Sequence, residues 1–352
     1  MRKHLLAAAL AATVMLAAPV YAYEFSQTIE TPITVNSHGK TLAGVTEKNV
    51  TILKVKLTDK DKQALAYRKP LKTSMHTLAG SKTPAAIQLG MNGVPVLNQG
   101  RHGSCVTFAD SAALNAALGR GDYISQLCSL ELGTHLERNG YIPSGWNGSL
   151  GPLVLEQMMR FGIVSKDTQN TKSCANVNEY PLKDANNIGN EMSLAEHKTV
   201  SENINDKVYW THLFSNDQVF DWKTDAPEKM QEVLANVKHA IVNGHRLTVG
   251  TFLILQPSCR AGACAATKSA NDTWALTRNL EVPPYEIGGH ELVITGYDDK
   301  AVAYDNLGGK HQGLLKLRNS WGADAGDNGD YYMSYDYFVK YVNEVQEIIP
   351  IK

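Results

Sequence analysis

A single cysteine stands where a helix is predicted to begin. Cys105 follows Gly100 and Gly103, and the residues after it carry an apolar stripe with helical spacing. The amino end of a helix carries partial positive charge, which favours the nucleophilic thiolate over the thiol. The glycines allow the backbone to pass close to a substrate. The alternative is a small buried cysteine at the start of an alanine-rich helix, so a nucleophilic Cys105 needs partners elsewhere in the chain.

Two polar residues in the last third of the chain could be those partners. His290 stands at the head of an apolar strand, and Asn319 follows another strand and lies close to a tryptophan. Each residue taken alone is usually structural. Together with Cys105, an imidazole and a side-chain amide are the groups needed for a nucleophile, its general base and the residue that orients that base.

The elements that must position these residues follow a clear order along the chain. Helical patterns come first, from Ser104 to the glycines at 119 and 121, over 150–161, and from Pro227 to about Gly244. Strand patterns follow at 247–255, 290–296, 301–304, 313–317 and 331–333. Helices followed by strands predict an α+β fold with two packed lobes.

The sequence resembles the papain family of cysteine peptidases at four places, which occur in the family's order. The four stretches are Gln99-Gly100-x-x-Gly103-Ser104-Cys105, Gly145-Trp146-Asn147-Gly148-Ser149, Gly289-His290 with Gly296-Tyr297, and Asn319-Ser320-Trp321-Gly322 with Gly326-Asp327-Asn328-Gly329. The second stretch is similar to the family's glycine wall, which lines the substrate cleft. The resemblance covers roughly residues 85 to 345. It implies a papain-like two-lobed fold with a helical lobe and a β-barrel-like lobe.

The resemblance also implies a role for each matching residue. Cys105 would be the nucleophile, His290 the general base and acid, and Asn319 the residue that orients the imidazole. The side-chain amide of Gln99 and the backbone N–H of Cys105 would form the oxyanion hole. The residues expected to contact the substrate are Asn147, Gly148, Ser149, Gly289, Glu291 and Trp321. These roles predict hydrolysis of a peptide bond through a thioester, without a cofactor or a metal ion.

Three departures from the family pattern concern the cleft. The family's cysteine three residues before the nucleophile and its partner in the glycine wall are replaced by His102 and Trp146, so one bridge is lost as a pair. The residue after the nucleophile is Val106 instead of an aromatic residue. Glu291 replaces a small residue beside the pocket for the second acyl-side residue of the substrate. A carboxylate there would favour Lys or Arg, unless it points away or pairs with a nearby cation.

Five cysteines leave at least one thiol unpaired within an exported chain. With Cys105 as the nucleophile, the other four cysteines allow three pairings. We predict Cys128–Cys174, which lies close to where the family places a bridge, and Cys259–Cys264, which closes a short loop.

The residues before the resemblance predict export. Residues 1–22 have a short positive start, an apolar run from Leu5 to Pro19, and a small-residue cleavage site that ends at Ala22. The apolar run is shorter than the roughly 20 residues that a membrane anchor needs. We therefore expect a signal peptide and a secreted or periplasmic protein.

Residues 23–84 are predicted to be a propeptide that inhibits the peptidase domain at 85–352. Strand-like patterns between Thr28 and Leu57 predict a β-hairpin or an added strand that docks on that domain. The polar, Lys-rich stretch at 58–84 reads as a linker that crosses the cleft. The alternative is a stable accessory domain that the active enzyme retains.

The overall charge excludes some classes of partner. The formal net charge is -1, and no block of Lys and Arg is long enough to indicate nucleic acid. We expect a monomer, without a membrane partner, that meets a protein or peptide substrate and its own propeptide. Two other functions fit the same scaffold: acyl transfer to an amine instead of water, and a catalytically silent binding domain.

Overall fold

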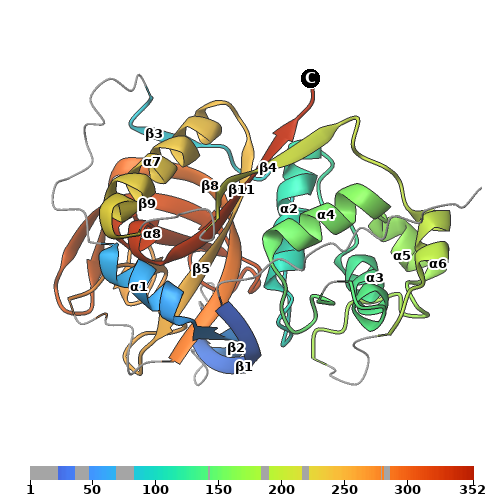
Figure 1. The fold of residues 1–352 in the computed structure, drawn as a ribbon, viewed down its shortest axis with the longest axis horizontal. Helices are drawn as coiled ribbons and strands as arrows, with labels where there is room; N and C mark the ends of the chain where they lie inside the picture. Colours follow the sequence, from blue (N-terminus) through green and yellow to red (C-terminus); the bar gives the residue numbers. More distant parts are fainter. Residues whose placement is uncertain are drawn as a thin grey trace, which may run out of the picture.

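The computed structural model describes residues 23–35, 47–68, 83–141, 143–183, 190–215, 222–278, 280 and 286–352. A lobe made of helices lies beside a lobe made of strands with further helices packed on them (Figure 1). The predicted α+β fold with a helical lobe and a strand lobe is therefore confirmed. Within the described ranges, no helix is both long and apolar enough to cross a membrane. The predicted signal peptide, 1–22, lies outside these ranges.

The helical lobe is built from helices of moderate length with polar residues or glycine at their ends. They are α2 (Cys105–Leu118), α3 (Gln126–Arg138), α4 (Gly151–Phe161), α5 (Lys166–Lys172) and α6 (Leu194–Val200). The hydroxyl of Ser125 accepts the backbone N–H of Cys128 and caps α3. Gly119 ends α2 with φ 64°, a left-handed conformation that suits glycine. α2 is buried from Cys105 to Ala116, so its first residue lies inside the protein.

The strand lobe is centred on β5 (Arg246–Leu255) and β8 (Glu286–Asp305), which pair antiparallel. The other strands after the hairpin are β3 (Ala86–Gln88), β4 (Val208–Ser215), β6 (Ala265–Ala266), β7 (Thr273–Trp274), β9 (Lys310–Arg318), β10 (Asp330–Ser334) and β11 (Val342–Pro350). β11 and β4 continue the sheet beyond β5. On the other side, β8, β6, β7, β10 and β9 follow one another, and β9 pairs again with β8. These strands therefore close into a barrel-like ring.

Two helices pack on the strand lobe, α7 (Trp222–Val242) and α8 (Tyr335–Tyr341). The sequence predicts that this helix starts at Pro227, but α7 begins earlier, at Trp222. A proline lacks a backbone donor and is common near the start of a helix, but it does not define the first helical residue. The predicted strands 290–296 and 301–304 are both parts of β8. The pairing of β8 with β9 shifts register between Asp298 and Val302.

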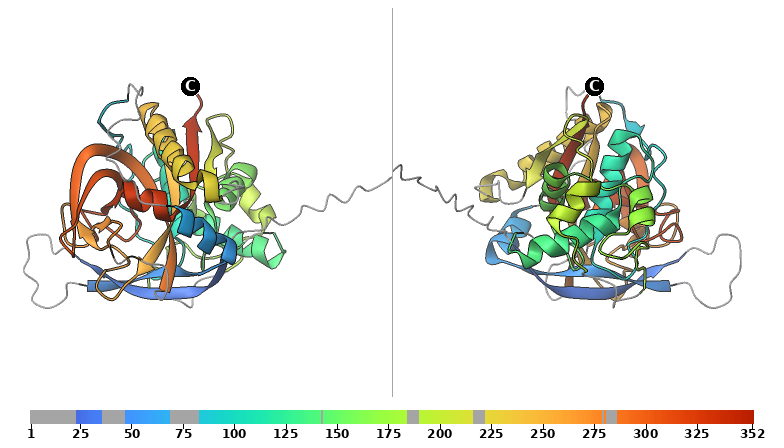
Figure 2. Two further views of the ribbon diagram at one scale, coloured as in Figure 1. Left: turned by 60° about the vertical axis from the view of Figure 1, so that its left-hand side comes forward. Right: turned by 90° about the vertical axis from the view of Figure 1, so that its right-hand side faces the viewer.

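Residues 23–35 and 47–68, here called the N-terminal unit, dock on the strand lobe. β1 (Tyr23–Thr34) and β2 (Glu47–Leu57) pair antiparallel, so the predicted β-hairpin is confirmed. β2 also pairs with β8, where Leu53 faces Gly289 and Lys54 faces Gly288. Figure 2 shows the hairpin running along one end of the molecule. Its buried apolar residues other than Leu53 belong to the same hydrophobic core as the strand lobe.

α1 (Asp59–Tyr67) corrects the expectation of an irregular linker after residue 57. Thr58 caps the helix by accepting the N–H of Asp61, whose carboxylate accepts the N–H of Thr58 in return. Ala64 and Leu65 are its buried apolar residues, so the helical pattern in the sequence is weak. The rest of the predicted linker, 69–82, lies outside the described residues.

Candidate active site

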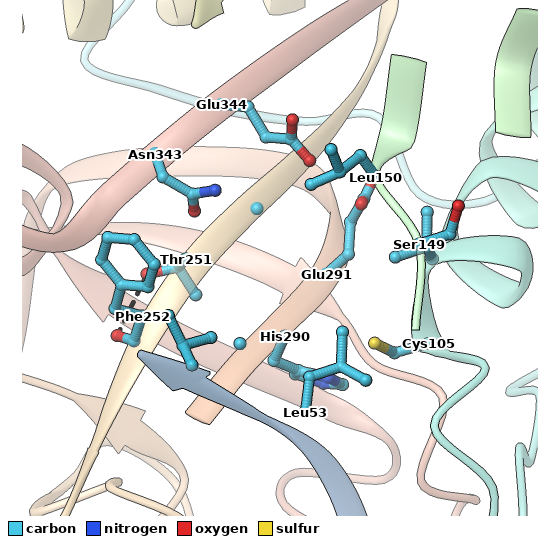
Figure 3. Close-up of a pocket in the computed structure, with 14 residues that line it drawn as sticks. Leu53, Cys105, Ser149, Leu150, Thr251, Phe252, His290, Glu291, Asn343 and Glu344 are labelled. Atoms are coloured by element: carbon cyan, nitrogen blue, oxygen red, sulfur yellow. Dashed lines mark hydrogen bonds between the residues drawn. The ribbon is translucent and has the colours of Figure 1, made fainter. Parts of the chain in front are cut away.

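Cys105 is the first residue of α2 and is fully buried. It lines a cavity together with Leu53 and His290 (Figure 3). Burial raises the pKa of the Cys105 thiol to about 11, although backbone N–H groups, that of Glu291 first, act in the opposite direction. The sequence predicts a thiolate favoured by the helix terminus. In this covered site burial acts in the opposite direction, because the loss of water outweighs the local N–H donors.

His290 projects from β8, and the structure defines the surroundings of both of its ring nitrogens. Its Nε2 and the Oδ1 of Asn319 are 2.8 Å apart. The ring of Trp321 stacks on the imidazole, with 4.5 Å between ring centroids, and covers this hydrogen bond. Nδ1 has no hydrogen-bond partner in the part of the chain that the structure describes. Nδ1 is therefore the ring nitrogen left to exchange a proton with a thiol.

The same burial acts on the imidazole. It lowers the pKa of His290 to about 4, and the hydrogen bond with Asn319 compensates only in part. With the raised pKa of Cys105, this makes both groups neutral at pH 7. The covered site therefore holds a thiol and an imidazole, and not the thiolate–imidazolium pair that reacts.

Gln99 is fixed beside the nucleophile by contacts on both sides. Its backbone N–H donates to the carbonyl of Ser320 at 2.8 Å, and the Ser320 hydroxyl donates to its side-chain oxygen at 2.7 Å. The side-chain nitrogen donates to the carbonyl of His102 at 2.8 Å and to that of Thr51 at 3.4 Å. Thr51 belongs to β2. A carbonyl of the N-terminal unit therefore stands against the predicted oxyanion donor.

β2 crosses this site and contacts both lobes. On the side of the strand lobe it pairs with β8 next to His290. On the side of the helical lobe the Thr51 hydroxyl donates to the carbonyl of Arg101, 2.9 Å away. The strand therefore spans the gap between the two lobes at the level of the nucleophile.

Leu53 is the side chain of β2 that lies over the thiol. It is 2% exposed and packs between Gly103 and Gly148. A Cβ on Gly148 would lie 2.5 Å from Leu53. Figure 3 shows Leu53 beside Cys105 and His290. The glycines of the predicted cleft therefore make room for a chain, and in this structure the chain that uses the room is the protein's own.

Two cavities lie along β2, and Cys105 lines the first of them. The first, here called the Glu291 cavity, is lined by Leu53, Val55, Cys105, Val106, Ser149, Leu150, Gly250, Thr251, Phe252, Gly289, His290, Glu291, Asn343 and Glu344. The second, here called the Trp321 cavity, is lined by Lys48, Asn49, Val50, Asn98, Gly100, Arg101, Leu182, Lys183 and Trp321. Of the other predicted substrate contacts, Gly148 touches Leu53, and Asn147 is exposed.

Three carboxylates come together at one end of the Glu291 cavity: Asp110 from α2, Glu291 from β8 and Glu344 from β11. Figure 3 shows Glu291 and Glu344 at that end. The hydroxyl of Thr248 lies near Asp110 and Glu291 but donates to Gln346 at 3.0 Å. Among the described residues, the carboxylate oxygens of Asp110 and of Glu291 have no partner with hydrogen-bond geometry. Burial, followed by the charges of neighbouring carboxylates, raises the pKa of Glu291 well above its ordinary value.

Asp110→Asn is expected to stabilise the protein at pH 8 and to leave its stability unchanged at pH 4. Burial raises the pKa of Asp110, so this carboxyl stabilises the fold fully below its unfolded pKa of about 4 and progressively less as the pH rises through its folded pKa. An amide is neutral at every pH. The free energy of unfolding in urea should therefore rise by about 1 to 3 kcal/mol at pH 8 only.

Glu156→Gln is the matched control, because Glu156 is an exposed carboxylate on α4. It should change the unfolding free energy at neither pH. An equal gain at pH 4 and pH 8 from Asp110→Asn would show that packing, and not the ionisation of Asp110, causes the effect.

The two positions that lack the family's cysteines contact each other. The rings of His102 and Trp146 meet edge to face at 5.2 Å, and Tyr180 stacks on Trp146 at 5.7 Å. The Tyr180 hydroxyl donates to the carbonyl of Gln99 at 2.9 Å and is 2.9 Å from the hydroxyl of Ser104. An aromatic cluster therefore stands where a bridge is missing and supports the segment before the nucleophile. Tyr180 lies in a polar stretch and was not among the predicted site residues.

The cysteines pair as the sequence predicts. Disulfides join Cys128 to Cys174 and Cys259 to Cys264, and Cys105 is the free cysteine. The first bridge lies in a small core of the helical lobe and ties α3 to the segment after α5. Among the described side chains, no group of three His, Cys, Asp or Glu residues is placed to hold a metal ion.

No family model and no curated protein matches this sequence. Solved structures that are similar over most of the chain include the following three. Xylellain, a cysteine protease from Xylella fastidiosa, is 14% identical, with 81% of this chain and 91% of that chain covered and a TM-score of 0.48. Digestive procathepsin L 3 of Tenebrio molitor larval midgut is 16% identical, with 83% and 79% covered and a TM-score of 0.43.

The third is the Amb a 11 cysteine protease of ragweed pollen in its proform. It is 18% identical, with 83% of this chain and 74% of that chain covered and a TM-score of 0.44. Likenesses at this level decide neither family nor activity. The function has to be inferred from the geometry of the site itself.

Proposed function

We propose that this chain is a cysteine peptidase, made as an inactive precursor, in which Cys105 attacks the peptide bond. The observation that carries the proposal is the setting of His290. Asn319 holds its Nε2, Trp321 covers that hydrogen bond, and Nδ1 is unpartnered within the described chain, in a cavity that Cys105 also lines. Buried polar groups are normally hydrogen-bonded, so an open ring nitrogen beside the free cysteine calls for a function. Proton transfer from a thiol is the function that these groups perform best.

The reaction follows from the positions of these groups. His290 takes the proton of Cys105 through Nδ1, and the sulfur attacks the carbonyl carbon of the substrate. The Gln99 side chain and the Cys105 backbone N–H donate to the oxygen that becomes negative, and losing one such donor typically costs roughly 3 to 4 kcal/mol. His290 then protonates the leaving amine as the C–N bond breaks. Water, deprotonated by His290, hydrolyses the resulting thioester and restores the thiol.

In this proposal the N-terminal unit blocks the site. The carbonyl of Thr51 accepts a hydrogen bond from the side-chain amide of Gln99, and residues 53 and 55 of β2 line the Glu291 cavity. Residues 48–50 line the Trp321 cavity. The leaving amine must depart beside His290 and the Trp321 stacked on it. β2 therefore enters from the leaving-group side and runs opposite to a productive substrate, which explains how it can fill the cleft without being cut.

The proposed organisation follows from this role. Residues 1–22 would be a signal peptide, 23–84 the propeptide and 85–352 the peptidase domain of a secreted or periplasmic monomer. The two disulfides suit such a compartment. Amino-terminal sequencing of the exported precursor should begin at Tyr23.

The experiment that tests the proposed function is labelling with a peptidyl epoxide that alkylates thiols. The full chain is treated before and after limited proteolysis between residues 69 and 82, and the labelled peptide is mapped. We expect label on Cys105 after proteolysis, together with hydrolysis of a peptide substrate that the label abolishes. Hydrolysis that persists after complete labelling of Cys105 would contradict the proposal.

We further expect the Glu291 cavity to favour a basic side chain on the acyl side of the substrate. Glu291 and Glu344 line it, and none of its lining residues is Lys or Arg. After β2 leaves and takes Leu53 and Val55 out of the cavity, an Arg or Lys side chain can pack its methylenes against Leu150 and Phe252 and pair with the carboxylates. Glu291→Gln and Glu344→Gln should each lower the ratio of kcat/KM for matched Arg and Leu peptides by about tenfold.

Glu286→Gln serves as the control, because Glu286 is an exposed carboxylate on the same strand that pairs with Lys54. The Arg-to-Leu ratio should be unaffected by this change. A ratio that survives both cavity variants would mean that the carboxylates do not meet the substrate.

A further inference from the structure

The Trp321 cavity has a volume of about 420 Å³ and lies on the leaving-group side of the site. This assignment depends on the proposed function, in which His290 protonates the leaving amine beside Trp321. One wall is Trp321, and the other is the helical-lobe segment 98–101 with residues 182 and 183. β2 forms the cover through residues 48–50. When β2 leaves, this cavity is where the residues after the cleaved bond must lie.

The helical-lobe wall is held by close backbone contacts. The N–H of Arg101 donates to the carbonyl of Leu182 at 3.1 Å. Gly100 has φ 61°, and a Cβ there would overlap the backbone of Leu182. His102 Nε2 is hydrogen-bonded to the carbonyl of Pro181. These contacts fix the position from which the Arg101 side chain extends.

This wall carries positive charge. Arg101 and Lys183 are its charged lining residues, and Asn98, Gly100 and Leu182 are neutral. The cover contributes Lys48, which pairs with Asp324. Once the cover leaves, Arg101 and Lys183 remain as the cations that line the cavity. The helical-lobe wall therefore attracts an anion at one defined place.

The precursor already presents a carboxylate to this wall. Oε1 of Glu30, on β1, lies 2.5 Å from Nη2 of Arg101. The pair is about half exposed, so it adds little to stability. What matters is the geometry: the guanidinium reaches a carboxylate carried by a chain that lies along the cleft. Removal of the N-terminal unit takes this partner away from Arg101.

We propose that Arg101, assisted by Lys183, binds a carboxylate on the leaving-group side of the substrate, in place of Glu30. A guanidinium binds a carboxylate through two parallel hydrogen bonds, which gives direction as well as attraction. The carboxylate has two possible sources. It is the side chain of Asp or Glu in a longer chain, or it is the terminal carboxylate of a short leaving group. The first source makes the protein an endopeptidase, and the second makes it an enzyme that trims carboxyl termini.

Four peptides with one common acyl side test the proposal and separate the two sources. Their leaving groups are Ala-Glu-amide, Ala-Gln-amide, Ala-Ala-amide and Ala-Ala with a free carboxylate. The full chain is used after limited proteolysis, with active sites counted by epoxide titration. We expect at least a tenfold higher kcat/KM for the Glu peptide over the Gln peptide, or for the free acid over the Ala-Ala amide. High salt should reduce that ratio, because Arg101 is partly exposed.

Arg101→Gln should bring the ratio to about one. Arg101→Glu should instead prefer a fifth peptide, with an Ala-Lys-amide leaving group, over the Gln peptide. Arg138→Gln, which changes an exposed arginine on α3, should keep the wild-type ratio. Equal rates for charged and neutral leaving groups, or a preference that Arg101→Gln retains, would overturn this inference and leave the proposed function standing. Failure to hydrolyse any of the peptides would overturn the proposed function, and this inference with it.

Discussion

Replacing Cys105 with alanine is expected to lower kcat for peptide hydrolysis by roughly 10⁴- to 10⁶-fold, the range found when the nucleophile of a comparable triad is removed. The change removes the only atom that can form the thioester, and the described residues contain no second free cysteine. Binding of the substrate should persist, because Gln99 and the Trp321 cavity are unchanged and the Glu291 cavity loses only the sulfur atom. Initial rates of the proteolysed full chain, with and without the substitution, measure the effect.

The control for this variant is a measurement of its free energy of unfolding. Alanine is a small apolar residue that adds no polar group to this fully buried site, so the unfolding free energy should change by no more than about 1 kcal/mol. Asn319→Ala provides a second comparison, because it keeps the thiol and frees the imidazole to turn. We expect that variant to lose about 100-fold in kcat. Hydrolysis by Cys105→Ala at the wild-type rate, with normal stability, would remove the basis of the mechanism.

The candidate site residues at the ends of helices and strands could be identified from the sequence alone. A cysteine after glycines at a helix start, a histidine at a strand head and an asparagine beside a tryptophan are local patterns. The structure places His290 against Asn319 and puts Cys105 in the same cavity as His290. The protonation state of the pair was not readable in the same way. It depends on water being excluded by Leu53, which is distant in sequence and reaches the site only through the docking of β2.

Glu344 illustrates a second limit of sequence reasoning. It lies in β11 directly after Asn343 and two residues before Gln346, and such a polar stretch normally marks a solvent-exposed part of a strand. β11 instead lies between the two lobes, with contacts to α2 and α4 as well as to β5, so both of its faces are covered. The sequence of a single strand does not show that other elements cover both of its faces. The cluster of Glu344 with Asp110 and Glu291 appears only when the lobes are brought together.

α1 was missed for the opposite reason. Its sequence, Asp59 to Tyr67, is dominated by polar residues, and the helix depends on the capping box at Thr58 and on burial of Ala64 and Leu65 against the strand lobe. The hairpin before it was predicted because alternation over β1 and β2 is a signal that the strands carry themselves. The pairing of β2 with β8 is tertiary, and no pattern within residues 47–57 indicates it.

Replacing Leu53 with glutamate is expected to open the precursor and to raise the rate at which iodoacetamide labels Cys105 by about 100-fold. Leu53 is almost fully buried over the thiol, and burying such a side chain contributes about 1.5 to 3 kcal/mol. A carboxylate in this apolar site adds a further penalty, so the covered state should lose about 3 kcal/mol relative to the open one. Labelling of the unproteolysed full chain at pH 7, followed by mass spectrometry, measures the rate.

The rest of the N-terminal unit should stay in place, because Arg68 is buried and donates to the carbonyls of Val342 and Lys340. The experiment therefore reports occupation of the cleft and not loss of the unit. Lys54→Glu is the matched control: Lys54 is the next residue of β2, partly exposed and paired with Glu286 at 2.8 Å. Losing that ion pair costs about 1 kcal/mol or less, so labelling should change by less than about fivefold. Equal labelling of the wild type and Leu53→Glu would show that the thiol is open in solution, and the N-terminal unit would then be a retained accessory domain.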